Sequence, residues 1–287
     1  MKFVTFSSEP FQTSQLGLLE GNDLLALPAG HQYDHPATLL EAMQKDTLQE
    51  TASLLKKHGV KIDQANIRFL PPIPRPPKIF CVGLNYVDHS KESNMDQPTY
   101  PTIFARYHTS LTGHKSPIIR PHSSIQLDYE GELVAFIGKG GRHISLADAL
   151  DHVAGYSVGN EACIRDYQFK APQWTIGKNF DQTGSIGPAF VTADELPRGG
   201  VGLDIQTRLN GVVVQHANTK DMVFDLATVI QVLSEAITLE CGDMIIAGTP
   251  SGVGMARKPQ LWMKPGDTVE VEIEGVGLLS NNIAQES

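Results

Sequence analysis

A proline-rich segment, residues 71–78 (PPIPRPPK), divides the chain, and five of its eight residues are proline. Proline fixes φ and lacks an N–H donor, so the segment excludes both a helix and a central strand. We therefore expect a stiff, extended connector between a small N-terminal domain, residues 1–72, and a larger domain, residues 73–287. A chain of 287 residues is long enough to bury a sizeable core.

The N-terminal part has the pattern of a small α/β domain that supports or covers the larger one. Residues 2–6 predict a short strand, and residues 16–27 (LGLLEGNDLLAL) place polar turn residues between two apolar runs. Residues 37–58 have apolar side chains at helical spacing, and Gly59 then predicts the end of the helix.

The larger part is rich in predicted strands. Three short apolar runs are bounded by Gly or Asp, which is typical of buried strands: KIFCVGLN, LVAFIG and DMIIAG. Asn210-Gly211 lies between two alternating runs and predicts a tight hairpin. Residues 225–238 predict a helix with one apolar face. Many strands with few helices favour an all-β or a β-dominated α+β core.

Charge and cysteine content exclude some classes of protein. The net charge of -9, with no Lys/Arg cluster, argues against a nucleic-acid partner. The three cysteines are far apart and form no CxxC pattern, which indicates reduced thiols. The N-terminal residues lack the apolar core of a signal peptide, and no apolar run is long enough to span a membrane. We therefore predict a cytoplasmic protein with no membrane partner.

The segment DYEGELVAFIG contains the strongest candidate for a metal site. Residues two apart in a strand share a face, so Glu130 and Glu132 should project together. Two adjacent carboxylates repel unless a cation lies between them or one is protonated. A hard divalent ion such as Mg²⁺ or Mn²⁺ is a common solution.

The alternative is a solvated strand face, which is how we interpret Glu270, Glu272 and Glu274. The difference is that Glu132 leads directly into the apolar run Leu133–Ile137, which suits burial on both faces. Carboxylates at the end of a buried strand need a partner. Glu161, at the end of another apolar run, is a candidate third carboxylate or simply part of a helix start.

His89 and Glu92 are three residues apart, a spacing that places both on one side of a helical turn. A carboxylate bound to an imidazole fixes its tautomer and raises its basicity, as a general base requires. Such pairs are also common on protein surfaces.

Five motifs together resemble the fumarylacetoacetate hydrolase superfamily: VGLNYVDHSKE, DYEGEL, GNEACIRDYQ, QWTIGKNFD and IAGTPSGVG. They occur in the family's order and approximate spacing, and the resemblance covers about residues 78–282. It implies a mixed β-roll or sandwich catalytic domain, usually in a homodimer, and one Mg²⁺ or Mn²⁺ held by three carboxylates. By position these are Glu130, Glu132 and Glu161, although the family more often has Asp at the third position.

The resemblance also assigns further residues. It implies that Lys178 stabilises enolate charge beside the metal, and that Gln168 and Thr249 line the carboxylate end of the substrate. Arg106 takes a position often held by Lys and is expected to bind the substrate acid as well.

The function we expect is metal-dependent hydrolysis of a carbon–carbon bond in a small 2,4-dioxo acid, an acylpyruvate, through a metal-stabilised enolate. His89, oriented by Glu92, would activate the attacking water. The same resemblance implies two alternative reactions, decarboxylation or isomerisation of oxo and dienoic diacids such as oxaloacetate, and a role in the catabolism of aromatic compounds. A further alternative is a non-catalytic member that only binds acids.

Overall fold

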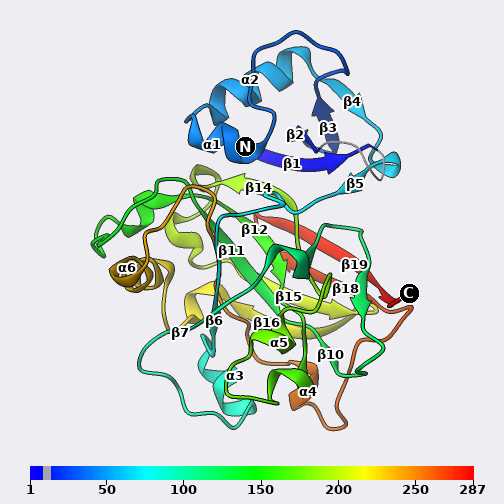
Figure 1. Ribbon diagram of the computed structural model, residues 1–287, viewed down its shortest axis with the longest axis vertical. Helices are drawn as coiled ribbons and strands as arrows, with labels where there is room; N and C mark the ends of the chain where they lie inside the picture. The colour runs from blue at the N-terminus through cyan, green and yellow to red at the C-terminus, as the bar shows by residue number, and fades with distance from the viewer. Residues whose placement is uncertain (9–13) are drawn as a thin grey trace.

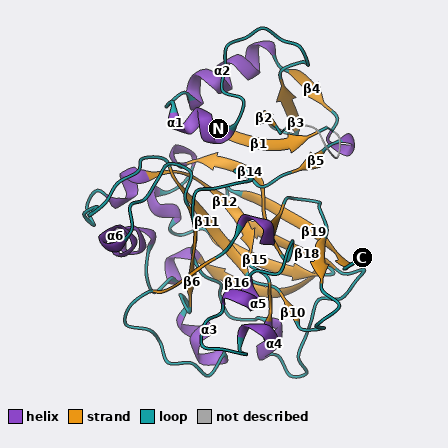
Figure 2. Ribbon diagram, viewed as in Figure 1, coloured by secondary structure: helices purple, strands orange, loops and turns teal. Residues whose placement is uncertain are grey.

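The computed structural model describes residues 1–8 and 14–287, and a large mixed sheet runs through it (Figures 1 and 2). Within the described residues the strand order along its main path is β4-β3-β2-β1-β14-β12-β11-β17-β6-β7, with β5 beside β1 and β8 beside β14. The strands are β1 Lys2–Ser7, β2 Gln15–Glu20, β3 Asp23–Ala26, β4 Val60–Ile62, β5 Arg68–Phe69, β6 Ile79–Gly83, β7 Thr102–Ala105, β8 Leu111–Thr112, β11 Gly131–Ile137, β12 Val153–Asn160, β14 Gly184–Thr192 and β17 Met244–Ile246.

A second, smaller sheet packs against one face of the large sheet. Its order is β16-β15-β18-β19-β9, with β9 Ile118–Arg120, β15 Asp204–Leu209, β16 Val212–Asn218, β18 Thr268–Ile273 and β19 Gly277–Gln285. Leu133 and Ala135 of β11 share a buried cluster with Val271 and Ile273 of β18. A short pair, β10 Leu127–Asp128 and β13 Cys163–Ile164, forms a separate two-stranded sheet. Its Leu127 and Ile164 share a buried cluster with Val269 and Ile283 of the small sheet.

Strand β11 is buried on both faces because its side chains alternate between two cores. Val134 and Phe136 point away from the small sheet into a cluster that includes Leu39 and Leu55. These two residues come from the helices α1 Leu39–Gln44 and α2 Leu48–His58. The prediction that the run after Glu132 is buried on both faces is therefore confirmed.

The other helices are short or lie at the edges of the sheets: α3 Val87–Glu92, α4 Arg165–Gln168, α5 Thr175–Lys178 and α6 Leu226–Ala236. The described residues also contain seven 3₁₀ turns: Gln64–Asn66, His108–Ser110, Ala149–His152, Ala193–Glu195, Arg198–Gly200, Thr219–Asp221 and Gly254–Ala256. Asp225 caps α6 through a hydrogen bond from the Thr228 N–H. No helix of the described residues is long and apolar enough to cross a membrane.

Both predicted hairpins form. Strands β2 and β3 pair with Leu18 opposite Leu25. Strands β15 and β16 are joined by Asn210 and Gly211, whose φ values of 51° and 78° are those of a type I′ turn. The single helix expected over residues 37–58 is instead two helices. Asp46 adopts a left-handed φ of 53° between them, which breaks the helix.

The β-dominated α+β fold is confirmed, with two sheets face to face and few helices (Figure 2). Residues 1–72 form most of the upper lobe in Figure 1. This lobe is not separate from the large sheet, because β1 pairs with β14 at Phe3 and Phe190. The domain boundary after residue 72 stays a prediction.

Replacing Phe136 with Ala should destabilise the protein by about 3–5 kcal/mol, because it leaves a cavity in a closed core. Phe136 is fully buried and packs edge-to-face on Phe190 with ring centroids 5.4 Å apart. The measurement is the free energy of unfolding in urea. Val212→Ala, at a side chain 66% exposed, is the control and should change it by less than about 0.5 kcal/mol. Equal effects of the two substitutions would contradict this packing.

Candidate active site

The candidate site lies at one edge of the large sheet, where β11 begins and where β12, β17 and β6 end. Gly131 at the start of β11 is opposite Asn160 at the end of β12, so the residues flanking this pair are neighbours. Strand β17 runs antiparallel to β11, and β6 runs parallel to β17, so both end at the same edge. A small cavity there is lined by residues from all four strand ends, including Gly83, Glu132, Glu161 and Thr249.

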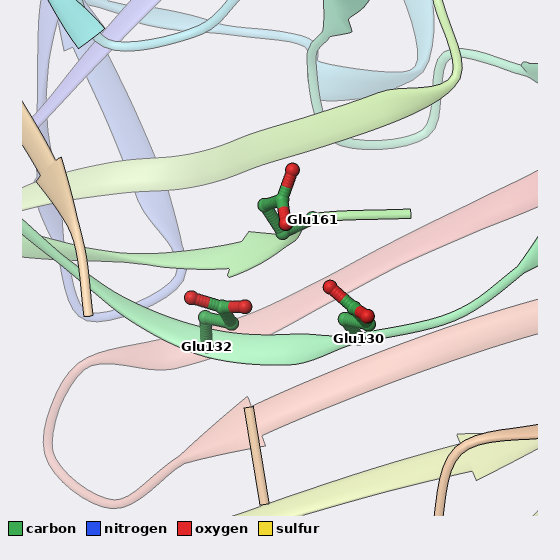
Figure 3. A group of neighbouring side chains, drawn as sticks. All are labelled: Glu130, Glu132 and Glu161. Carbon is green, nitrogen blue, oxygen red and sulfur yellow. The ribbon is translucent and has the colours of Figure 1, made fainter. Parts of the chain in front are cut away.

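The three predicted carboxylates meet in this cavity. Glu130, Glu132 and Glu161 are each no more than 3% exposed, and one oxygen of each lies within 4.8 Å of the others. Figure 3 shows the three side chains gathered on one side of β11. Glu130 precedes β11 instead of lying in it. Its backbone is fixed by a hydrogen bond from the Glu161 N–H to the Glu130 carbonyl, 2.8 Å.

Three buried cations contact two of these carboxylates. Lys178 Nζ lies 2.6 Å from Glu130 Oε2 and 2.5 Å from Glu161 Oε2. Arg165 lies 2.7 Å from Glu130 Oε1, and Arg106 lies 2.6 Å from Glu161 Oε1. Each carboxylate is thus held at both oxygens by a cation.

Glu132 has no cationic partner among the described residues and accepts only the Gly248 N–H, 2.5 Å. Burial, followed by repulsion from Glu161 and Glu130, raises the pKa of Glu132 well above its usual value. Burial also acts to raise the pKa of Glu130, but Lys178 and Arg165 outweigh it and lower that pKa. The negative charge of the cluster is therefore incompletely balanced at Glu132.

This donor set fits a hard divalent cation. Carboxylate oxygens are the ligands that Mg²⁺ and Mn²⁺ prefer. A bound cation would also supply the positive charge that no described side chain provides at Glu132. Glu161 reaches the cluster despite its extra methylene relative to Asp, because Arg106 and Lys178 hold its carboxylate. The three oxygens can therefore be offered together to one ion.

His89 and Glu92 form the expected pair on α3. His89 Nδ1 lies 2.9 Å from Glu92 Oε1, and His89 lines the cavity. Its Nε2 atom has no hydrogen bond to the described residues, so it is free to meet a substrate or a water. Glu92 in turn accepts the Gly252 N–H at 2.8 Å. The carboxylate thus holds the imidazole ring from outside the cavity.

The three residues expected at the substrate are not equivalent in position. Gln168 and Thr249 line the cavity, where Gln168 Oε1 accepts from Arg165 and Thr249 Oγ1 donates to the Gly131 carbonyl. Arg106 does not line it. Its guanidinium donates to Glu161, Ser110, Thr183 and the Ala162 carbonyl. This position gives Arg106 a contact with the third carboxylate, and its contact with the substrate stays a prediction.

Arg165 is a cavity residue that the sequence pattern did not identify. It lies in the motif GNEACIRDYQ, but we assigned it no role. The structure shows it 3% exposed, with its Nε donating to Asp128 Oδ2 at 2.8 Å. The neighbouring Asp166 accepts from Ser124. The available sequence indication was the three-residue spacing from Arg165 to Gln168, which places both on one helical turn.

Comparisons with known proteins agree with this geometry. The fumarylacetoacetate (FAA) hydrolase C-terminal family model matches residues 78–284. A mitochondrial oxaloacetate tautomerase of Xenopus laevis is 39% identical over 99% of this chain and 90% of its own length. The solved fumarylacetoacetate hydrolase of Exiguobacterium antarcticum is 33% identical with a TM-score of 0.85, and all of both chains is covered. A 2-hydroxyhepta-2,4-diene-1,7-dioate isomerase from Mycobacterium marinum is 31% identical with a TM-score of 0.76, covering 100% and 99%.

One prediction is contradicted by these relatives. The tautomerase of Xenopus laevis and its human counterpart are both named as mitochondrial proteins, whereas we predicted a cytoplasmic location. That prediction was wrong because it rested only on the lack of a signal peptide and on reduced cysteines, and these do not separate one reducing compartment from another.

The metal-free protein should lose stability as the pH rises above the usual carboxyl pKa of 4.5. With its pKa raised, Glu132 binds more protons in the folded than in the unfolded state, so the free energy of unfolding falls with increasing pH. Glu132→Gln should make this decline shallower above pH 4.5, measured by urea unfolding in EDTA. The exposed Glu274→Gln is the control and should keep the wild-type slope. Identical slopes for wild type and Glu132→Gln would contradict the expected protonation.

Proposed function

This chain belongs to the fumarylacetoacetate hydrolase family, and we propose that it is a metal-dependent isomerase of a small 2-oxo diacid. The reaction proposed is interconversion of the keto and enol forms of a substrate such as oxaloacetate. The observation that carries it is the free imidazole nitrogen of His89, which shares one cavity with three buried carboxylates and Lys178. The oxaloacetate tautomerase relative supports this reaction over hydrolysis.

Glu130, Glu132 and Glu161 would hold Mg²⁺ or Mn²⁺. When bound, the ion supplies Lewis acidity toward the oxygens of a 2-oxo acid and so favours an enolate. The residues around the carboxylates keep them in place for it: Arg106 at Glu161, Arg165 at Glu130 and the Gly248 N–H at Glu132.

His89 would carry the proton. Its neutral ring, held at Nδ1 by Glu92, takes the C3 proton of the keto acid at Nε2. The C–H electron pair becomes the C2–C3 double bond, and the carbonyl π electrons move to the oxygen on C2. His89 then returns the proton to that oxygen and regenerates its neutral ring. No water or other reactant is consumed.

Lys178 would stabilise the negative charge that develops on the substrate oxygen. Two of its N–H groups are engaged by Glu130 and Glu161, which leaves one for the substrate. Glu130 and Glu161 also outweigh burial and raise the pKa of Lys178, so it stays charged at neutral pH. Gln168 and Thr249 would orient the substrate carboxylate at the adjacent wall.

Hydrolysis of an acylpyruvate is the second candidate, and the same His89–Glu92 pair favours it. An imidazole held by a carboxylate can deprotonate a water as well as a carbon acid. Decarboxylation needs stabilisation of the enolate but no attacking water. A protein that only binds acids needs neither.

That the protein is a homodimer stays a prediction, and analytical ultracentrifugation would measure its oligomeric state.

The assay follows the enol absorbance of oxaloacetate with metal-stripped protein, with and without Mg²⁺ or Mn²⁺. Metal-dependent equilibration of enol and keto forms is the expected result. His89→Ala should lower kcat/KM by about 10²- to 10⁴-fold because the proton carrier is lost. His216→Ala is the matched control, since His216 also pairs with a carboxylate, Asp204 at 2.9 Å, but on the exposed surface. It should keep wild-type activity.

Other outcomes would overturn the proposal. Release of pyruvate from oxaloacetate without prior enol–keto equilibration would indicate a decarboxylase. Cleavage of acetylpyruvate, with no effect on oxaloacetate, would indicate the hydrolase. Metal binding without turnover of either acid would indicate a protein that only binds acids.

A further inference from the structure

The carboxylate of Glu92 is held by the backbone of a turn that follows β17. The Gly252 N–H donates to both Glu92 oxygens, at 2.8 and 3.0 Å, and the Val253 N–H lies 3.5 Å from Oε1. Glu92 is 21% exposed at its side chain, so solvent competes for its oxygens. The orientation of Glu92, and through it that of His89, therefore depends on how firmly this turn is fixed.

Two side chains fix the turn from its other side. Arg257 Nε and the Tyr129 hydroxyl both donate to the Gly252 carbonyl, at 3.1 and 3.0 Å. That carbonyl belongs to the same peptide group as the Val253 N–H, so these two bonds set the plane of the peptide that follows the Gly252 Cα. The Gly252 N–H, which makes the shorter bonds to Glu92, belongs to the preceding peptide, and the two planes are linked through the φ and ψ angles of Gly252.

Arg257 also connects the turn to neighbouring structure. Its Nε contacts the Tyr129 hydroxyl at 3.0 Å, and its second nitrogen donates to the Val214 carbonyl of β16 at 2.6 Å. Tyr129 is fully buried. The turn is thus tied to the small sheet and to the residue that precedes Glu130.

The conformation of Gly252 adds to this dependence. Its φ is +108°, a backbone conformation that residues other than glycine rarely adopt. A Cβ at this position would lie 2.1 Å from the Val214 carbonyl oxygen. A glycine without such ties would have several accessible conformations, so the turn needs external contacts to keep its N–H toward Glu92.

We propose that Arg257, together with Tyr129, is a positioning residue for the His89–Glu92 pair. It touches neither the cavity nor the three carboxylates. It acts by fixing the Gly252 carbonyl, which limits the backbone angles of Gly252 and so the direction of the Gly252 N–H that binds Glu92. Glu92 then keeps the proton of neutral His89 on Nδ1 and leaves Nε2 as the base. The kinetic part of this inference rests on the proposed isomerase function, whereas the tautomer part does not.

The test compares Arg257→Met and Tyr129→Phe with wild type by two readouts. In ¹⁵N spectra of the imidazole, the Nδ1–H tautomer of His89 should dominate in wild type and decline in both variants. In the isomerase assay, kcat should fall about tenfold for Arg257→Met, with KM and the Mn²⁺ dissociation constant unchanged, because only the base is misoriented. Arg257→Lys should recover part of the tautomer preference, since an ammonium can reach the Gly252 carbonyl.

Arg208→Met is the matched control, since it removes an arginine that pairs with Glu270 and Glu272 on the small sheet. It should change neither readout. An unchanged His89 tautomer in Arg257→Met would overturn the inference even if the enzyme isomerises oxaloacetate. A shifted tautomer in a protein without isomerase activity would support the inference and reject the proposed function. Weaker Mn²⁺ binding in Arg257→Met would assign it a structural role at the carboxylates instead.

Discussion

Burial of three carboxylates in one small volume is the constraint on which the rest of this structure depends. An isolated buried carboxylate is costly, and three adjacent ones are more so unless cations accompany them. Lys178, Arg165 and Arg106 neutralise two of the three, Glu130 and Glu161. The third, Glu132, has no cationic partner among the described residues, so one further cation would offset its charge. Burial raises the pKa of both Glu132 and Glu161.

The turn after β17 connects this cluster to the proton-transfer groups. Its backbone N–H groups bind Glu132 at Gly248, Glu92 at Gly252 and Asp128 at Gly254. Backbone donors are fixed in direction and carry no side-chain entropy, so one turn can hold several carboxylates at once. The carboxylate cluster and the His89–Glu92 pair therefore share one backbone support.

The arrangement also explains why one family can include isomerases and hydrolases. A cation site, an ammonium and an imidazole base are sufficient to form and protonate an enolate, and each of these reactions includes that step. Isomerases and hydrolases must then differ in whether a water molecule can enter the cavity together with the substrate. The cavity seen here is small, and Val82 and Phe104 are among the residues that line it.

The sequence alone determined the strands, the hairpins and the candidate carboxylates, because these depend on local alternation, turn residues and motif order. It also placed His89 and Glu92 on one helical turn, where spacing is sufficient. Only the tertiary structure decided which charges meet. Lys178 reaches Glu130 across 48 residues, and Arg106 reaches Glu161 across 55, because four strand ends converge at one edge of the sheet. Such pairings depend on long-range packing, which no local pattern encodes.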